Sequence, residues 1–236
     1  MSESRSTRYR VAPPAAVLWD MDGTLVDSEK LWDRVLHESA ERLGGRLSPA
    51  TRERMVGCNA AVTVDLLLAE VGIPATGQAR ADADAWLTGR MTELFRESLP
   101  WCEGAAEALH LVRAAGIPTA LVTSTVRELT EHALDRIGRH FFDVTVCGDE
   151  VGGRNKPDPE PYRRAAELLG VDPVRCVAVE DSPIGATSAE AAGCTVLVVP
   201  SELPVAPGPR RVPLGSLSAF DLDRLSASGN GHPGAL

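Results

Sequence analysis

Lysine is nearly absent from this 236-residue chain. Among its 24 basic side chains only Lys30 and Lys156 are lysines, and all the others are arginines. A bias in composition would explain this. An alternative explanation for Lys156 is a position that needs a compact ammonium group, which the planar guanidinium of arginine cannot replace. The motifs around Lys156 have to decide between the two.

The chain also lacks the features of several protein classes. Its five cysteines are odd in number and include no C-x-x-C pair, so we expect small buried thiols of a reduced compartment rather than disulfides or a zinc site. The net charge of −9 argues against nucleic acid or an anionic membrane as a partner. No apolar stretch is long enough for a signal peptide or a membrane span. We therefore expect a monomeric, cytoplasmic protein that acts on a small molecule.

Short valine-rich apolar runs alternate with helical patterns over much of the chain. Five runs are too short for helices and have turn residues nearby, as is typical of buried strands: 15–20, 118–124, 143–148, 175–181 and 194–200. Four helical patterns, each ending in a glycine, alternate with the later strands: 104–116, 126–138, 159–170 and 182–193. This alternation predicts an α/β fold with a doubly wound parallel sheet.

Residues 28–99 interrupt the alternation. They contain several helical patterns and no convincing strand, which predicts an α-helical cap domain inserted after the first strand. We therefore expect an α/β core formed by 15–27 and 100–225, a helical cap formed by 28–99, and disordered polar tails at 1–14 and 226–236.

The first predicted strand runs into the sequence DMDGT, which contains Asp20, Asp22 and Gly23. Ligands of open α/β sheets bind outside the carboxyl ends of the strands, which is where this group falls. Gly23 permits a tight turn, and we include it among the expected phosphate-binding residues. Asp and Gly are also ordinary turn residues, which is the structural alternative. Two carboxylates at this spacing can serve as a nucleophile and a general acid/base, a division suited to phosphoryl transfer.

Such a concentration of carboxylates needs positive charge nearby, and two later motifs could provide it, one by binding a metal ion and the other as a lysine. Glu180 and Asp181 end the strand at 175–181 and offer oxygen ligands suited to Mg²⁺, although an acidic pair before a helix is more often a helix cap. Lys156 lies between two predicted strands and would provide a point charge. Each of these signals is weak by itself.

A hydroxyl-rich motif ends the strand at 118–124. Thr123, Ser124 and Thr125 could hold phosphate oxygens at the start of a helix, or they could simply cap that helix. Taken with the carboxylates and Lys156, this gives four signals in order, each at or after the carboxyl end of a predicted strand. Their joint occurrence favours one phosphoryl-transfer site.

With these motifs the chain resembles the haloacid dehalogenase-like hydrolase superfamily, in the branch with a helical cap after the first motif. The four motifs of the family match, in order, Asp20 with Asp22, Thr123, Lys156, and Glu180 with Asp181. The resemblance implies Asp20 as the nucleophile and Asp22 as the general acid/base. It also implies Mg²⁺ held by Asp20, the backbone carbonyl of Asp22 and Asp181, with Glu180 acting through water.

Within the superfamily, the sequences DSEKLWDR and KPDPEPY…EDSPIG are most similar to bacterial sugar-phosphate phosphatases. β-Phosphoglucomutases share the scaffold, but they carry a histidine where this chain has Trp32. They also carry a cap lysine, and this chain has none between Lys30 and Lys156. The resemblance implies a Mg²⁺-dependent phosphatase of a small metabolite, such as a sugar or polyol phosphate, acting through an aspartyl-phosphate. A mutase remains the alternative.

Two other functions are less favoured. A phospho-acceptor signalling domain also combines Asp, Thr or Ser, and Lys on a doubly wound sheet, but receiver domains lack the second aspartate and the helical insert. A dehalogenase would leave Asp22 and the metal carboxylates without a purpose.

Side chains of the predicted cap are expected to select the leaving group. Trp32, Arg54, Asn59 and Trp86 are candidates, because each could stack on or hydrogen-bond a polar organic group. For the two tryptophans, packing in the core is the commoner role.

Overall fold

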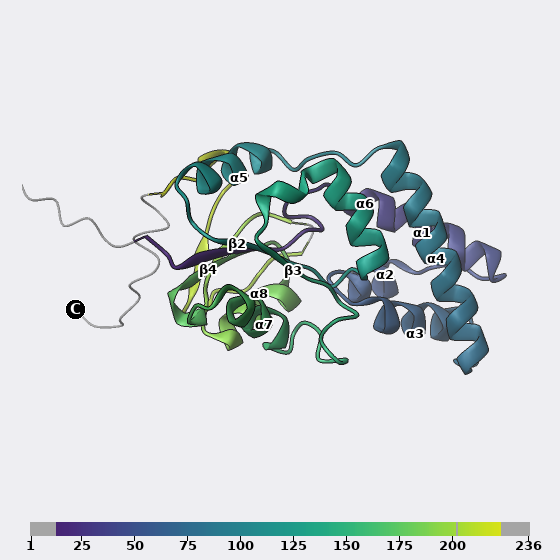
Figure 1. Ribbon diagram of the computed structural model, residues 1–236. Helices are drawn as coiled ribbons and strands as arrows, with labels where there is room; N and C mark the ends of the chain where they lie inside the picture. Colours follow the sequence, from purple (N-terminus) through teal and green to yellow (C-terminus); the bar gives the residue numbers. More distant parts are fainter. Residues whose placement is uncertain (1–12, 202, 223–236) are drawn as a thin grey trace, which may run out of the picture.

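The computed structural model of the protein describes residues 13–201 and 203–222 (Figure 1). The predicted C-terminal tail at 226–236 and residues 1–12 of the predicted N-terminal tail lie outside the described residues. Within them, six parallel strands form one sheet in the order β3-β2-β1-β4-β5-β6. The strands are β1 (Ala16–Trp19), β2 (Thr119–Val122), β3 (Val144–Val146), β4 (Cys176–Glu180), β5 (Thr195–Val198) and β6 (Arg211–Pro213).

Helices flank this sheet and extend from one end of it. Those that alternate with the strands are α5 (Ala105–Ala114), α6 (Arg127–Ile137), α7 (Glu160–Leu169) and α8 (Pro183–Ala192). Those between β1 and β2 are α1 (Glu29–Arg42), α2 (Pro49–Met55), α3 (Ala60–Glu70) and α4 (Gly77–Glu97). Short 3₁₀ helices occur at Arg139–Phe141, Pro173–Arg175 and Leu217–Ala219. None of the described helices combines the length and hydropathy needed to cross a membrane.

The central strands are buried on both faces, and successive side chains point to opposite faces. On β1, Val17 and Trp19 belong to the apolar cluster that includes α5 and α6, whereas Ala16 and Leu18 belong to the cluster that includes α7 and α8. Figure 1 shows these helix pairs on the two sides of the sheet. The predicted doubly wound parallel sheet is confirmed.

Helices α1 to α4 lie together at one end of the molecule (Figure 1). Their starts follow local rules, because the side chains of Ser48, Asn59 and Thr76 accept hydrogen bonds from the first turns of α2, α3 and α4. The segments that leave and re-enter the sheet region pair with each other, since the Asp27 N–H donates to the carbonyl of Pro100 at 2.9 Å. Residues 28–99 are therefore helical as predicted, and their independence as a cap domain stays a prediction.

Strand β6 was not predicted. Arg211–Pro213 has no apolar run, and it lies at the edge of the sheet, where it pairs only with β5. Edge strands are short and tolerate charge and proline, because one side of the backbone needs no ladder partner. The sequence signal for a strand is therefore missing at this position.

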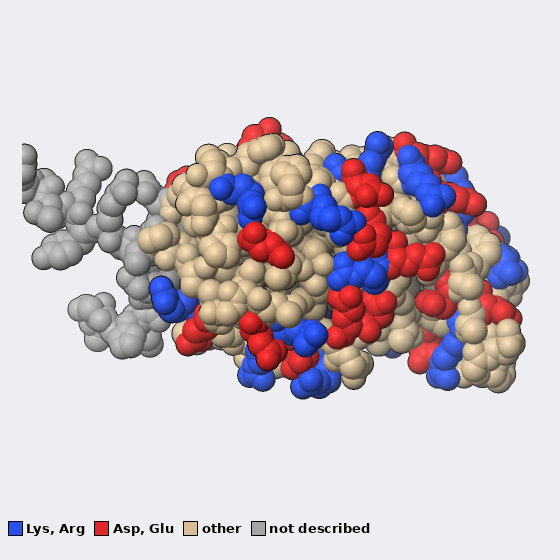
Figure 2. Space-filling model, in the orientation of Figure 1, with Lys and Arg blue, Asp and Glu red and all other residues tan. Residues whose placement is uncertain are grey.

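Acidic and basic side chains are intermixed on the face seen in Figure 2, and no basic region dominates it. Interspersed charges of this kind give a solvated surface rather than an electrostatic footprint for a polyanion.

Candidate active site

The predicted site residues gather at the carboxyl ends of neighbouring strands. Asp20 directly follows β1, and its N–H donates to the carbonyl of Val179 at 3.0 Å, so the ladder between β1 and β4 continues to the aspartate. Thr123 follows β2 and its N–H donates to the carbonyl of Val146 at 3.0 Å. The backbone of both residues is thus fixed by the sheet.

Lys156 lies at the centre of this group and is only 6% exposed. Its ammonium donates to Asp20 Oδ1 at 2.7 Å, to Glu180 Oε1 at 2.7 Å and to the carbonyl of Val122 at 2.9 Å. Burial alone would lower the pKa of Lys156, but the carboxylates of Asp20 and Glu180 outweigh burial, so the pKa lies above its ordinary value. Three acceptors, on β2, on β4 and directly after β1, match the three rotatable donors of an ammonium, which a planar guanidinium cannot reproduce.

Glu180 is fully buried and its carboxylate is committed to protein contacts. Besides Lys156, the Tyr162 hydroxyl donates to Oε1 at 2.6 Å and the Ser182 hydroxyl donates to Oε2 at 3.1 Å. Gly185 leaves room for this carboxylate, because a Cβ there would lie 1.9 Å from Oε1. The arrangement makes Glu180 the anchor of Lys156, and it fits an indirect rather than a direct contact with a metal. Tyr162 was not predicted as a site residue.

Asp20, Glu180 and Asp181 form a buried cluster in which one carboxylate oxygen of each residue lies within 4.8 Å of one oxygen of each of the others. Burial raises the pKa of Asp20 to about 7, although Lys156 lowers it. Burial also raises the pKa of Asp181 well above its ordinary value, and the negative charge of Asp20 adds to this effect. One ammonium therefore does not balance the cluster, and a donor set made only of hard oxygens fits Mg²⁺.

Gly23 packs directly against this cluster. Its φ of +78° lies in the left-handed region, and a Cβ at this position would lie 2.2 Å from Asp181 Oδ2. Glycine is therefore required for the turn that brings the DMDGT segment against the carboxylate of Asp181.

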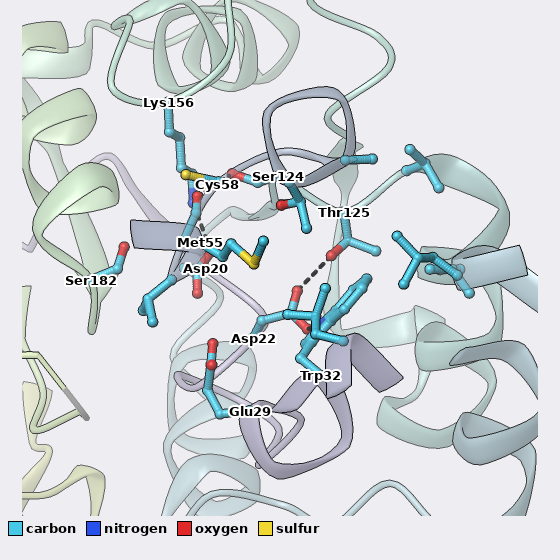
Figure 3. A pocket seen from close by; sticks show the side chains of 18 of the residues that line it. Asp20, Asp22, Glu29, Trp32, Met55, Cys58, Ser124, Thr125, Lys156 and Ser182 are labelled. Carbon is cyan, nitrogen blue, oxygen red and sulfur yellow. Dashed lines mark hydrogen bonds and ion pairs between the residues drawn. The ribbon is translucent and has the colours of Figure 1, made fainter. Parts of the chain in front are cut away.

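Asp22 has a separate set of partners (Figure 3). Its Oδ1 accepts from the Ser28 hydroxyl at 2.6 Å and from Trp32 Nε1 at 3.1 Å. Its Oδ2 accepts from the Thr125 hydroxyl at 2.7 Å and from the Thr123 hydroxyl at 3.3 Å. The two aspartates of the DMDGT motif thus have different surroundings, one beside a buried ammonium and the other within a cluster of neutral donors.

An open cavity joins these groups to the helices that follow β1. Asp20, Asp22, Lys156 and Asp181 line its floor. Its apolar lining comes from two segments of the chain. Leu36, Met55, Val56 and Leu87 lie between β1 and β2, whereas Val126 and Leu129 lie at the start of α6. Figure 3 shows Trp32 and Thr125 beside Asp22, with Ser124 near the loop that carries Cys58. Ser124 donates its hydroxyl to the carbonyl of Gly57 at 3.3 Å, so it lies at the junction of the two segments.

The other predicted substrate contacts lie further away. Asn59 Oδ1 accepts from the Val62 N–H at 3.1 Å and lines a neighbouring hollow rather than this cavity. Neither Arg54 nor Trp86 lines either space. Arg52, which was not predicted, lines the cavity instead. Helix α2 is only seven residues long, which is too short for its sequence to distinguish the face of Arg52 from that of Arg54.

A family model described as haloacid dehalogenase-like hydrolase matches residues 14–193. The chain belongs to this family.

Known members show how far this likeness extends. Hexitol phosphatase B of Escherichia coli (strain K12) is 32% identical over 214 residues, which cover 90% of this chain and 94% of that protein. Validoxylamine A 7'-phosphate phosphatase of Streptomyces hygroscopicus subsp. limoneus is 32% identical and covers 78% of this chain and 83% of its own length. The crystal structure of CbbY from Rhodobacter sphaeroides in complex with phosphate has a TM-score of 0.76 at 29% identity, with 87% and 95% covered. The predicted superfamily is confirmed, and so is the predicted class of enzyme, a phosphoric monoester hydrolase.

Proposed function

We propose that this hydrolase is a Mg²⁺-dependent phosphatase of a small phosphorylated metabolite, a sugar or polyol phosphate, and that it acts through an aspartyl-phosphate on Asp20. The observation that carries the proposal is the convergence of two differently surrounded aspartates, Asp20 and Asp22, in one cavity with a buried Lys156. Pairs of carboxyl groups in unlike surroundings are the usual basis for separate nucleophile and acid/base roles. The phosphatase relatives support the same reaction.

Asp20 is suited to attack phosphorus. Lys156 holds its Oδ1, and among the described residues no hydrogen bond occupies its other oxygen. In the first step that oxygen bonds to phosphorus as the bond to the leaving oxygen breaks. Asp20 and Asp181, with the backbone carbonyl of Asp22, would hold Mg²⁺, which supplies charge stabilisation when bound. Lys156 adds a fixed positive charge on the protein side of the transferring group.

Asp22 is suited to move the proton. In the first step it donates its proton to the leaving oxygen, and in the second it accepts a proton from the water that attacks the aspartyl-phosphate. The hydroxyls of Ser28 and Thr125 can reverse and accept, whereas the Trp32 N–H only donates. Trp32 therefore keeps Oδ1 as an acceptor and directs the transferable proton to Oδ2. Hydrolysis of the aspartyl-phosphate releases phosphate and restores both carboxyl groups.

The mutase alternative has less support. Trp32 occupies the position beside Asp22 where mutases carry a histidine, and a donor-only indole cannot relay a proton as an imidazole does. A phospho-acceptor domain is also disfavoured, because Asp22 lines the same cavity as Asp20, and a second carboxyl group there supports turnover rather than a persistent phosphoprotein. The monomeric state and the cytoplasmic location belong to this proposal as predictions from the sequence.

The proposal is tested by a screen of phosphorylated sugars and polyols with purified protein and Mg²⁺, with released phosphate as the readout. We expect multiple turnovers, abolished by excess chelator and restored by Mg²⁺. Asp20→Asn preserves shape but removes the nucleophile, so the rate should fall by about three orders of magnitude or more. A phosphoryl group trapped on another residue, or phosphate transfer to a second sugar in place of release, would overturn the assignment.

A further inference from the structure

The cations that line the cavity are already paired with carboxylates, within the described part of the chain. Lys156 engages Asp20 and Glu180. The other lining cation is Arg52 on α2, which is 8% exposed and binds Glu29 Oε2 at 2.9 Å and Asp33 Oδ1 at 3.2 Å. The part of the substrate beyond the phosphate would therefore meet, among the described lining residues, only cations that already have carboxylate partners.

Asp84, on α4, brings an unbalanced negative charge to the same cavity. It is an exposed lining residue on the helical segment between β1 and β2, and among the described residues no cation or hydrogen-bond donor contacts its carboxylate. Its pKa lies above the ordinary value, because partial burial of the carboxylate and the nearby Glu128 both raise it. The leaving-group side of the cavity is thus acidic.

A second hollow continues this pattern. It shares Ala60, Asp84, Ser124 and Val126 with the catalytic cavity, so the two spaces are neighbours. Its lining cation, Arg80, is held by both oxygens of Asp65 at 2.6 and 3.3 Å. The carboxylate of Asp149 also lines it. A leaving group that extends into this second hollow would likewise meet carboxylates and a cation that already has a carboxylate partner.

We propose that this phosphatase selects leaving groups without a negative charge, and that Asp84 is the residue that excludes anionic ones. The inference rests on the proposed function and narrows its substrate class to esters of neutral or cationic polyhydroxy compounds. A carboxylate or second phosphate on the leaving group would approach Asp84 and Glu29 with no free countercharge, and such like-charge contacts select against a ligand. Hydroxyl groups, in contrast, can donate to Asp84 and bond to the lining hydroxyls of Thr63 and Thr88.

Sorbitol 6-phosphate and 6-phosphogluconate are matched probes, because they differ at the terminal carbon, which is a hydroxymethyl group in one and a carboxylate in the other. Each is measured as a competitive inhibitor of p-nitrophenyl phosphate hydrolysis, so that binding is read whether or not the probe is itself hydrolysed. We expect the wild-type protein to bind the hexitol ester roughly tenfold more tightly. Added salt should reduce this preference, because the repulsion is electrostatic and partly exposed to solvent.

Asp84→Asn should reduce the preference by a factor of roughly three or more, through tighter binding of the anionic probe. Asp82→Asn is the matched control. Asp82 lies on the same helix, accepts from the Gln78 amide at 2.8 Å and lines neither hollow, so its removal should leave the preference unchanged.

Equal inhibition by the two probes in the wild-type protein, or inhibition by neither, would overturn the proposal. A preference that is unchanged in Asp84→Asn would overturn the role of Asp84. In both cases the phosphatase function stands as long as p-nitrophenyl phosphate is hydrolysed with Mg²⁺ and Asp20→Asn abolishes that hydrolysis. Absence of this hydrolysis in the wild-type protein would instead overturn the proposed function itself.

Discussion

Replacing Lys156 with arginine tests whether this position needs an ammonium group. The substitution keeps the positive charge but replaces three rotatable donors on one atom with a wide planar fork. The three acceptors, Asp20 Oδ1, Glu180 Oε1 and the Val122 carbonyl, all lie within 2.9 Å of Nζ, and the ring of Tyr162 has its centroid 5.1 Å from it. A guanidinium therefore has to displace at least one of these groups.

The expected loss follows from the contact that is displaced. A hydrogen bond to a charged group contributes about 1.5–3 kcal/mol. If the contact with Asp20 is the one that fails, and the loss falls on the transition state, turnover drops roughly ten- to a hundredfold. The assay compares kcat for Lys156→Arg and Lys30→Arg on the same substrate, with thermal unfolding of each variant measured in parallel. Lys30 is the matched control, because its side chain is 81% exposed and its ion pair with Asp27, at 2.9 Å, lies at the surface.

Wild-type turnover in Lys156→Arg would refute the argument and leave composition as the explanation for the lysine. Equal losses in both variants would refute it as well, because a general intolerance of the substitution would then account for the result.

The remaining predictions concern the acid/base group and the metal. Asp22→Asn should slow hydrolysis of alkyl phosphates by about 10²–10⁴-fold and that of p-nitrophenyl phosphate less, because the activated leaving group needs little protonation in the first step; steady-state kinetics on both esters measures the difference. Trp32→Phe keeps the ring but removes the N–H that donates to Asp22, so kcat on alkyl phosphates should fall roughly three- to thirtyfold, whereas an unchanged rate would exclude a positioning role for the indole. The pKa of Asp20 is raised by burial to about 7, so the folded metal-free protein keeps a proton that the unfolded chain loses above about pH 4, and its stability should fall as the pH rises through this range. Mg²⁺ competes with that proton, and the rise in Tm on adding Mg²⁺ should be larger at about pH 8 than at about pH 5; calorimetry showing the opposite order would contradict the proposed metal ligands.

The sheet could be predicted from sequence because its central strands are buried on both faces and read as continuous valine-rich runs. Strand β6 escaped prediction because its environment, an edge, imposes no such composition. A similar contrast explains why the catalytic residues could be predicted from the sequence and the residues of the cavity wall could not. Asp20 and Asp181 have places that are fixed by strand ends, whereas the contacts of Trp32 depend on how α1 packs over the sheet.

The hydrogen-bond partners of some side chains could be identified only from the structure. Tyr162 and Ala166 are four residues apart on the buried face of α7, so a buried hydroxyl there could be expected, but its acceptor on β4 could not. Asn59 is expected from the sequence to hydrogen-bond a polar leaving group, yet its side-chain oxygen caps α3. Polar residues at helix starts are ambiguous in this way, because the cap and the ligand compete for the same lone pairs.

The burial of Lys156 leaves the chain with a single lysine that solvent can reach. An ammonium with all three hydrogens engaged by buried acceptors has no accessible lone pair, so acylating reagents should not modify it in the folded protein. Lys30 is exposed and lies on α1, the helix that carries Trp32. An amine-reactive fluorophore, applied after the more acidic α-amino group has been acylated at lower pH, would therefore label one defined site on the helical segment without introduced cysteines. The scarcity of lysine thus allows a fluorophore to be placed on α1 of the natural sequence, where it would report on the environment of this helix.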